Sequence, residues 1–322
     1  MTRSAIQAMG FELGPEILEQ CRALFDAEQQ VLAERMPVSQ ADVPYGPEAR
    51  HRLDLYRPEG GDNAAPVLVF VHGGGFLKGD KGGADAWPNA NVGRMAAQAG
   101  FLGVVINYRL APDHAWPAGA EDVAAVVAWL RAHAADHGGD ADRIVLAGTS
   151  AGAVHVAGYL GRSGDRDIRA AILLSGLYGY TPLDARDMLY YGEPALYPDR
   201  MPMEAVAATS LPLLVACAQF DPLRFQAEFL GLMQDRLARY GTMPRALILP
   251  GHNHYSMPMH LGTADRRLAD LGHSQGALTT TVDGKLDTFG DLDDAGDGRD
   301  RLEWRDSDRG EGDFGDVGGR LT

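Results

Sequence analysis

Short apolar runs alternate with helical patterns along the middle of the chain. Residues 67–71 read Val-Leu-Val-Phe-Val, which indicates a strand buried on both faces. Comparable runs predict strands at residues 102–107, 143–147, 170–174, 211–216 and 245–249. Apolar residues at helical spacing predict helices between most of them, for example over residues 120–135, 151–160 and 224–240. This alternation predicts an α/β protein with a mostly parallel central sheet and helices on both faces.

Three segments depart from the alternation. Residues 14–36 carry apolar side chains at helical spacing, which predicts an amphipathic helix and a candidate lid. Residues 52–56 alternate as an antiparallel strand does. Residues 178–208 are rich in Tyr, Met and Pro, too long for an ordinary connection and too apolar for a solvated loop. We interpret them as part of a small helical cap over a pocket; a locally packed excursion is the alternative.

The end of the chain has a different composition. Residues 276–322 are dense in Asp and Gly, with few apolar residues and no periodicity, which predicts disorder. Calcium binding by the closely spaced Asp291, Asp293 and Asp297 is a weaker alternative. Leu302 stands where an EF-hand would have its bidentate Glu, which argues against it.

Composition and charge narrow the function classes. The 322 residues are 45% hydrophobic, enough for a core of full domain size, and the formal net charge is −15. That charge repels phosphate backbones and anionic membrane surfaces, so we expect neither nucleic acid nor membrane as a partner. The sequence predicts no signal peptide and no membrane span, which favours a cytoplasmic protein.

A serine lies in a motif typical of nucleophiles. Gly148-Thr149-Ser150-Ala151-Gly152 follows an apolar strand and precedes an Ala/Val-rich helix. Small residues in G-x-S-x-G allow a tight strand-turn-helix elbow that exposes the serine hydroxyl beside a helix N-terminus. A glycine-lined structural turn is the alternative.

A glycine-rich loop offers backbone donors. His72-Gly73-Gly74-Gly75-Phe76 directly follows the strand predicted at 67–71. Without β-carbons, the backbone N–H groups can approach a developing oxyanion, and Gly74, Gly75 and Ala151 are the candidate donors. Phosphate binding is disfavoured because no Gly-Lys-Ser/Thr and no G-x-G-x-x-G follows.

A serine nucleophile needs a base and a group that orients the base. Asp221 follows one predicted strand, and His252 and His254 follow the next through a Pro-Gly pair. The order Ser, Asp, His is typical of the α/β-hydrolase fold. We choose His254 as the base. A helix-capping role for Asp221, and metal binding by His252, His254 and His260, are the alternatives.

Several motifs together resemble a known family, the hormone-sensitive-lipase-like carboxylesterases. Over roughly residues 50–270 the chain carries these in order: His72-Gly73-Gly74-Gly75-Phe76, Asn107-Tyr108-Arg109-Leu110-Ala111-Pro112 with Trp116-Pro117 and Glu121-Asp122, Gly148-Thr149-Ser150-Ala151-Gly152, Asp221-Pro222 and His254-Tyr255. The resemblance implies the α/β-hydrolase fold with Ser150, Asp221 and His254 as the triad. It also favours His254 over His252, because the family's catalytic histidine is commonly followed by an aromatic residue. Thr149 and Ala153 depart from the family's usual Asp and Gly, and this stretch looks more like the arylformamidase branch of the fold.

These observations predict a serine hydrolase that cleaves small carboxylic esters through an acyl-enzyme, with no cofactor and no metal. An arylformamidase that hydrolyses N-formylkynurenine-type amides is the nearest alternative, and a non-catalytic small-molecule receptor is a further one. We expect N-terminal cap helices over 1–45, a catalytic domain over 46–275 with a cap insertion at about 178–208, and the acidic tail over 276–322. The sequence does not decide whether the protein forms a homodimer.

Overall fold

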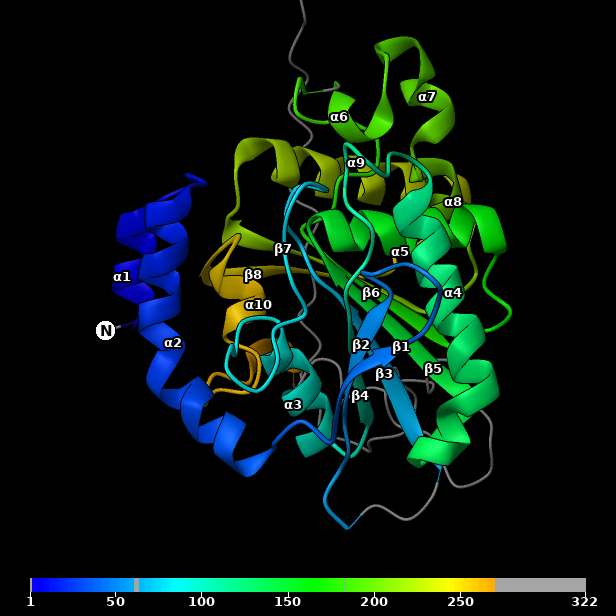
Figure 1. Ribbon diagram of the computed structural model, residues 1–322. Helices are drawn as coiled ribbons and strands as arrows, with labels where there is room; N and C mark the ends of the chain where they lie inside the picture. Colours follow the sequence, from blue (N-terminus) through cyan, green and yellow to red (C-terminus); the bar gives the residue numbers. More distant parts are fainter. Residues whose placement is uncertain (1, 61–63, 183, 270–322) are drawn as a thin grey trace, which may run out of the picture. The chain divides into compact units, whose positions relative to one another are not determined.

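The computed structural model describes residues 2–60, 64–182 and 184–269. An eight-stranded sheet runs through it, in which the two pairs that involve β2 are antiparallel and all the others are parallel (Figure 1). In spatial order the strands are β1 (Gln40–Pro44), β2 (Arg52–Tyr56), β4 (Leu102–Ile106), β3 (Ala65–Val71), β5 (Gly139–Thr149), β6 (Ala170–Leu174), β7 (Leu213–Phe220) and β8 (Arg245–Asn253). The predicted fold class is confirmed. The predicted tail and its candidate calcium site lie outside the described residues.

The sheet is covered on both faces, as the alternation of strand β3 shows. Val67, Val69 and Val71 belong to one hydrophobic core, and Leu68 and Phe70 to another. The first core includes residues of α4 (Ala118–His133), α5 (Ala151–Ser163) and α9 (Leu223–Tyr240), and the second includes residues of α3 (Ala90–Gln98) and α10 (Ser256–Met259). Each fully buried aliphatic side chain contributes about 1.5–3 kcal/mol, so the central strands fix the scaffold that carries the loops.

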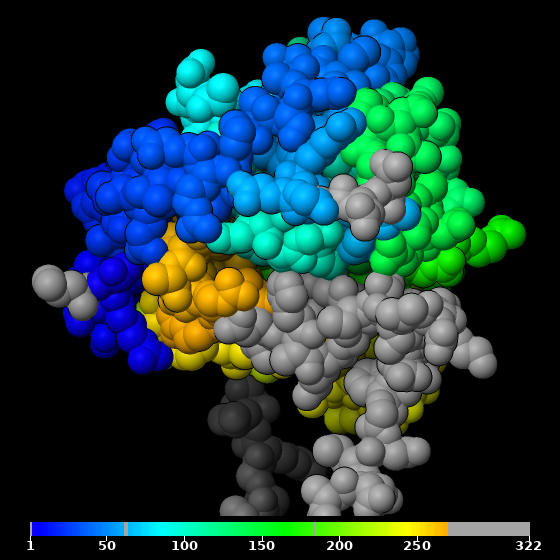
Figure 2. All heavy atoms as spheres, turned by 90° about the horizontal axis from the view of Figure 1, so that it is seen from below, coloured from blue at the N-terminus to red at the C-terminus, as the bar shows by residue number. Residues whose placement is uncertain are grey.

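Two N-terminal helices lie beside the end of the described chain. These are α1 (Thr2–Met9) and α2 (Pro15–Arg35), and Figure 2 shows their blue surface bordering the orange residues after β8. The buried Gln29 amide donates to the carbonyl oxygens of Met259 and Leu261 at 2.8 and 2.9 Å. Glu28 accepts a hydrogen bond from the Ala264 amide. Helix α2 is therefore bound to α10 and the loop after it by specific polar contacts.

The segment 178–208 folds into short helices next to α9. These are α6 (Met188–Tyr191), η2 (Pro194–Leu196), α7 (Tyr197–Arg200) and α8 (Met203–Ala208), in the upper part of Figure 1. The carboxylate of Glu228 on α9, fully buried, accepts the backbone N–H groups of Tyr178, Gly179, Tyr180 and Thr181. One side chain thus fixes the start of the segment.

The structure adds elements that the apolar pattern did not predict. Helices α1 and α3 and strand β1 are new, and β1 is almost fully exposed, so it lacks the buried alternation that reveals a strand. Strand β8 runs on to Asn253 instead of ending near 249, and a register shift interrupts its pairing with β7. A 3-10 turn, η1 (Ala134–His137), extends α4.

Candidate active site

Ser150 lies at a strained elbow between β5 and α5. Its φ of 54° and ψ of −123° lie outside the regions that L-residues usually adopt, and such strain is typical of exposed nucleophiles. The flanking glycines are required by close packing. A β-carbon on Gly148 would lie 2.4 Å from the Gly152 carbonyl oxygen, and one on Gly152 would lie 2.0 Å from that of Val71. The predicted elbow is therefore present, with Ala151 as the first residue of α5.

The glycine-rich loop after β3 lies against this serine. A β-carbon on Gly73 would come within 3.1 Å of the Ser150 Cβ. Gly74 (φ +135°) and Gly75 (φ +62°) adopt conformations that favour glycine. In the described residues, the N–H groups of Gly74 and Gly75 donate to no protein acceptor. They are available to a ligand oxygen, as is expected of the N–H groups in the first turn of a helix such as α5.

Asp221 is a fully buried carboxylate at the end of β7. Its Oδ1 accepts a hydrogen bond of 2.7 Å from Nδ1 of His254. Its Oδ2 accepts hydrogen bonds from the Ser175 hydroxyl at 2.5 Å and the Ala218 amide at 2.6 Å. The Ala218 contact closes a tight turn at the start of α9, and Gln226 holds the Asp221 carbonyl oxygen at 2.6 Å. Both carboxylate oxygens are thus fixed, and Nδ1 of the imidazole carries the proton.

The two neighbouring histidines have different surroundings. His254 is paired with Asp221 and packs on the Phe225 ring, with ring centroids 4.3 Å apart. His252 points instead to Ser256 and Asp265, and burial lowers its pKa to about 4. The structure therefore brings together the aspartate and the histidine chosen from the sequence and places His252 in another cluster.

An aromatic cluster joins the elbow to the capping segments. Its buried members are Phe76, Ala111, Ala151, Val154, Leu177, Tyr190, Tyr191, Tyr197 and Phe225, with Leu13, Leu77, Trp116 and Met201 packed against them. The rings of Phe76 and Tyr190 stack with centroids 4.4 Å apart. Because Ala151 follows the elbow serine and Phe225 packs on His254, the cluster connects the two parts of the site. It also includes Leu13, from the turn between α1 and α2.

His155, a buried residue of α5, packs against aromatic side chains next to the glycine-rich loop. Its ring contacts those of Phe76, Tyr108 and Tyr190, and burial lowers its pKa to about 3. A β-carbon on Gly119 would lie 2.2 Å from the imidazole. His155 is therefore a neutral packing residue that supports Phe76.

Sequence analysis missed three residues of this site. Ser175, Phe225 and Tyr190 contact Asp221, His254 and Phe76, respectively. Ser175 had a detectable signal, since it is the first polar residue after the strand predicted at 170–174. The contacts of Phe225 and Tyr190 depend on helix packing, which the linear sequence does not display.

The strand order and the elbow define the chain as an α/β-hydrolase-fold protein. The family model BD-FAE matches residues 53–175. The chain is 31% identical to Esterase LipQ of Mycobacterium tuberculosis over 246 residues. This match covers 66% of this chain and 57% of LipQ. It is 32% identical over 240 residues to the carboxylic ester hydrolase LipN of the same species, covering 63% and 62%.

A solved structure supports the same relationship. The crystal structure of esterase LipW from Mycobacterium marinum matches this chain with a TM-score of 0.57 and 26% sequence identity, and the match covers 82% of this chain and 91% of LipW. These matches confirm the resemblance to carboxylesterases of this fold. The chain spans less than two thirds of the length of the two curated relatives.

Proposed function

We propose that this chain is a carboxylesterase that cleaves small carboxylic esters through an acyl-enzyme on Ser150. The observation that carries the proposal is the hydrogen bond from His254 Nδ1 to the buried Asp221, which leaves Nε2 of the imidazole as a base. The elbow conformation of Ser150, and the loop at Gly73 that leaves little room for a β-carbon beside this serine, provide the other parts. The similarity to named esterases supports ester hydrolysis.

The proposed mechanism follows from these positions. Ser150 Oγ attacks the ester carbonyl while His254 takes its proton, and Asp221 stays ionised to stabilise the imidazolium. The amides of Gly74, Gly75 and Ala151 hold the developing oxyanion. His254 then returns the proton to the leaving alcohol, and a water molecule activated by the same imidazole hydrolyses the acyl-enzyme.

The capping segments bound the substrate site in this proposal. Residues 178–208 contribute Tyr190, Tyr191 and Tyr197 to the aromatic cluster, and the N-terminal segment contributes Leu13. Large side chains that close over a cleft exclude water and limit its volume. We therefore assign both segments to a cap that favours small acyl groups.

A covalent probe tests the nucleophile directly. A fluorophosphonate should label the full chain with a stoichiometry of one, and Ser150→Ala should abolish labelling while it preserves the melting temperature. Ser163→Ala is the matched control, since it removes an exposed hydroxyl at the far end of the same helix and leaves the proposed triad intact. Labelling that persists in Ser150→Ala would refute the assignment.

A substrate comparison tests the ester preference. Turnover of p-nitrophenyl acetate and butyrate should exceed turnover of N-formylkynurenine by at least about tenfold in kcat/KM, a difference of about 1.4 kcal/mol between the transition states. Faster turnover of the formamide would favour the arylformamidase alternative, and absence of both activities would favour a receptor.

The partners and the location of the protein are predictions from the sequence alone. In the described residues, no helix is both long and apolar enough to cross a bilayer. We propose that the protein is cytoplasmic, that its binding partner is a small ester substrate, and that it binds neither nucleic acid nor membranes. A homodimer is a further prediction that sedimentation can test.

A further inference from the structure

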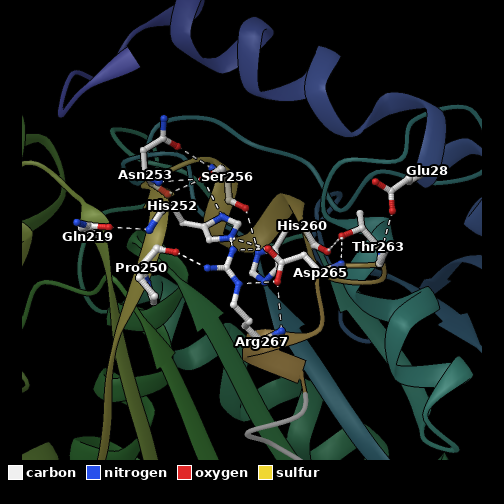
Figure 3. Close-up of polar contacts among 12 residues, drawn as sticks. Glu28, Gln219, Pro250, His252, Asn253, Ser256, His260, Thr263, Asp265 and Arg267 are labelled. Atoms are coloured by element: carbon white, nitrogen blue, oxygen red, sulfur yellow. Dashed lines mark hydrogen bonds and ion pairs between the residues drawn. The ribbon is translucent and has the colours of Figure 1, made fainter. Parts of the chain in front are cut away.

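A second cluster of ionisable side chains lies next to the catalytic loop but contributes nothing to the proposed triad. His252 comes from the end of β8, His260 follows α10, and Asp265 lies on the loop after α10 (Figure 3). One ligand-type atom from each of the three lies within 4.8 Å of the others. Both histidines are almost completely buried.

Ser256 orients both imidazoles. Nδ1 of His260 lies 3.2 Å from the Ser256 carbonyl oxygen, which only accepts, so Nδ1 carries the proton and Nε2 has a lone pair. That Nε2 is buried and has no hydrogen-bond partner among the described residues. Nδ1 of His252 lies 3.1 Å from the Ser256 hydroxyl. Anchoring of the outer nitrogen in this way is typical of histidines that bind metals through the inner nitrogen.

The positively charged side chain of Arg267 contacts the cluster. Its guanidinium lies 2.8 Å from Nε2 of His252 and contacts the Asp265 carboxylate. The same Nε2 lies 3.1 Å from Oδ2 of Asp265, so it accepts from Arg267 in the tautomer in which Nδ1 donates to the Ser256 hydroxyl and donates to Asp265 in the other. The Arg267 side chain is 39% exposed and also donates a hydrogen bond of 2.5 Å to the Pro250 carbonyl oxygen, whereas both histidines are buried. The cluster thus combines one carboxylate with two imidazoles, and a partly exposed guanidinium stands where a metal cation would balance the carboxylate charge.

We propose that His252, His260 and Asp265 bind a divalent transition-metal ion of the zinc type, and that Arg267 moves aside when the ion binds. Two imidazole nitrogens and one carboxylate suit Zn²⁺, with water as the fourth ligand, whereas Ca²⁺ and Mg²⁺ prefer oxygen ligands. The ion would bridge the two ends of the segment 252–265, which includes His254. The site is separate from the proposed triad and does not depend on the proposed esterase activity.

Cobalt(II) titration of the full chain, after treatment with a chelator and dialysis, tests the site. We expect saturable visible absorption of four-coordinate Co²⁺ at about one equivalent, displaced by Zn²⁺. Saturating Zn²⁺ should raise the melting temperature by about 5 °C, because an ion that binds only the folded state stabilises it. The titration reads the metal itself and needs no substrate.

Three variants make the outcome decisive. His260→Gln should abolish the cobalt absorption, whereas the exposed His133→Gln should leave it unchanged. Arg267→Met should tighten Co²⁺ binding by about tenfold or more, because it removes the competing cation and keeps all three ligands. It also tests the site if His260→Gln does not fold.

Three results would overturn the proposal. The first is no saturable absorption in either the native chain or Arg267→Met. The second is the same titration curve for the native chain and a folded His260→Gln. The third is binding confined to Arg267→Met, since arginine would then be the permanent cation of the native chain.

Discussion

Ser175 donates a hydrogen bond of 2.5 Å to Oδ2 of Asp221, while the other carboxylate oxygen accepts the hydrogen bond from His254. Ser175 is buried at the end of β6 and has a φ of 46°. It therefore fixes the rotation of the Asp221 carboxylate from the side opposite the imidazole. We infer that Ser175 is a positioning residue of the proposed triad.

Removing the Ser175 hydroxyl should lower kcat by about tenfold, because hydrogen bonds to charged groups contribute about 1.5–3 kcal/mol and only part of this reaches the transition state. KM should change little, since Ser175 acts through Asp221. Ser175→Ala and Ser175→Gly both lack the hydroxyl, but glycine tolerates the positive φ better. If both variants lose the same factor in kcat but differ in melting temperature, the loss of kcat is due to the missing hydroxyl and not to backbone strain. If kcat stays within twofold in both, Ser175 has no positioning role.

The assignment of the base predicts unequal effects for two histidines. His254→Ala should lower kcat by on the order of 10⁴ or more, because the serine proton would lose its acceptor. His252→Ala should lower kcat far less, because its contacts run to Ser256, Asp265 and Arg267. Steady-state kinetics with p-nitrophenyl acetate measures both, and the melting temperature controls for unfolding. The reverse order of effects would make His252 the base.

The sequence predicts the sheet and the motif residues well because both have local signals. The strand at 170–174 has the same bounds in the structure, since its five apolar residues are flanked by polar ones. The elbow was identifiable because Gly148 and Gly152 are required within a few residues of Ser150. In the sequence, only the family resemblance favoured His254 over His252 as the base. In the structure their partners differ, since His254 contacts Asp221 and His252 contacts Asp265.

Contacts that join distant parts of the chain could not be predicted. Glu228 reads as an ordinary helix residue, yet it binds four successive amides some fifty residues earlier in the chain. The cluster of His252, His260 and Asp265 has irregular spacing, and only the fold of the loop after β8 brings it together. Glu228, His252 and His260 are buried, but a polar residue in a sequence is normally expected at the surface, so the sequence did not indicate these contacts.

Glu228 should control the order of the capping segment 178–208. Glu228→Gln preserves size but replaces one acceptor oxygen with a donor that faces backbone N–H groups. We expect a loss of about 2–3 kcal/mol in the free energy of unfolding, as is common when buried donors lose a charged partner. KM should rise more than kcat falls. The exposed Glu204→Gln is the matched control, and equal urea denaturation of the two variants would contradict the role.

Acid should destabilise the fold through its buried histidines. Burial lowers the pKa of His72 to about 4 and that of His155 to about 3, both from 6.5. The unfolded chain therefore binds protons first as pH falls, and stability is lost from about pH 6.5 down to these lower pKa values. Each histidine should account for on the order of 3 kcal/mol between pH 6.5 and pH 4.

Urea denaturation at pH 7 and pH 4 measures this dependence. His155→Leu should show a smaller difference between the two pH values than the native chain, because one buried titrating group is gone. His133→Leu removes an exposed histidine on α4 and should leave the difference unchanged. A pH dependence that His155→Leu does not reduce would show that carboxylates dominate acid unfolding.

The cap predicts a preference for short acyl chains. We expect kcat/KM to peak between acetyl and hexanoyl esters, because Tyr190, Tyr191 and Phe76 are packed close to the elbow. Each methylene that fits should add about 0.8 kcal/mol, or roughly fourfold in kcat/KM, and the first that does not fit should reverse the trend. Leu13→Ala should move the peak toward longer esters, whereas Leu18→Ala, which removes the same atoms from the cluster around Ile6 and Phe25, should leave it in place. Preferential hydrolysis of emulsified long-chain triglycerides would refute the short-chain preference, and an unchanged profile in Leu13→Ala would refute the role of the N-terminal segment.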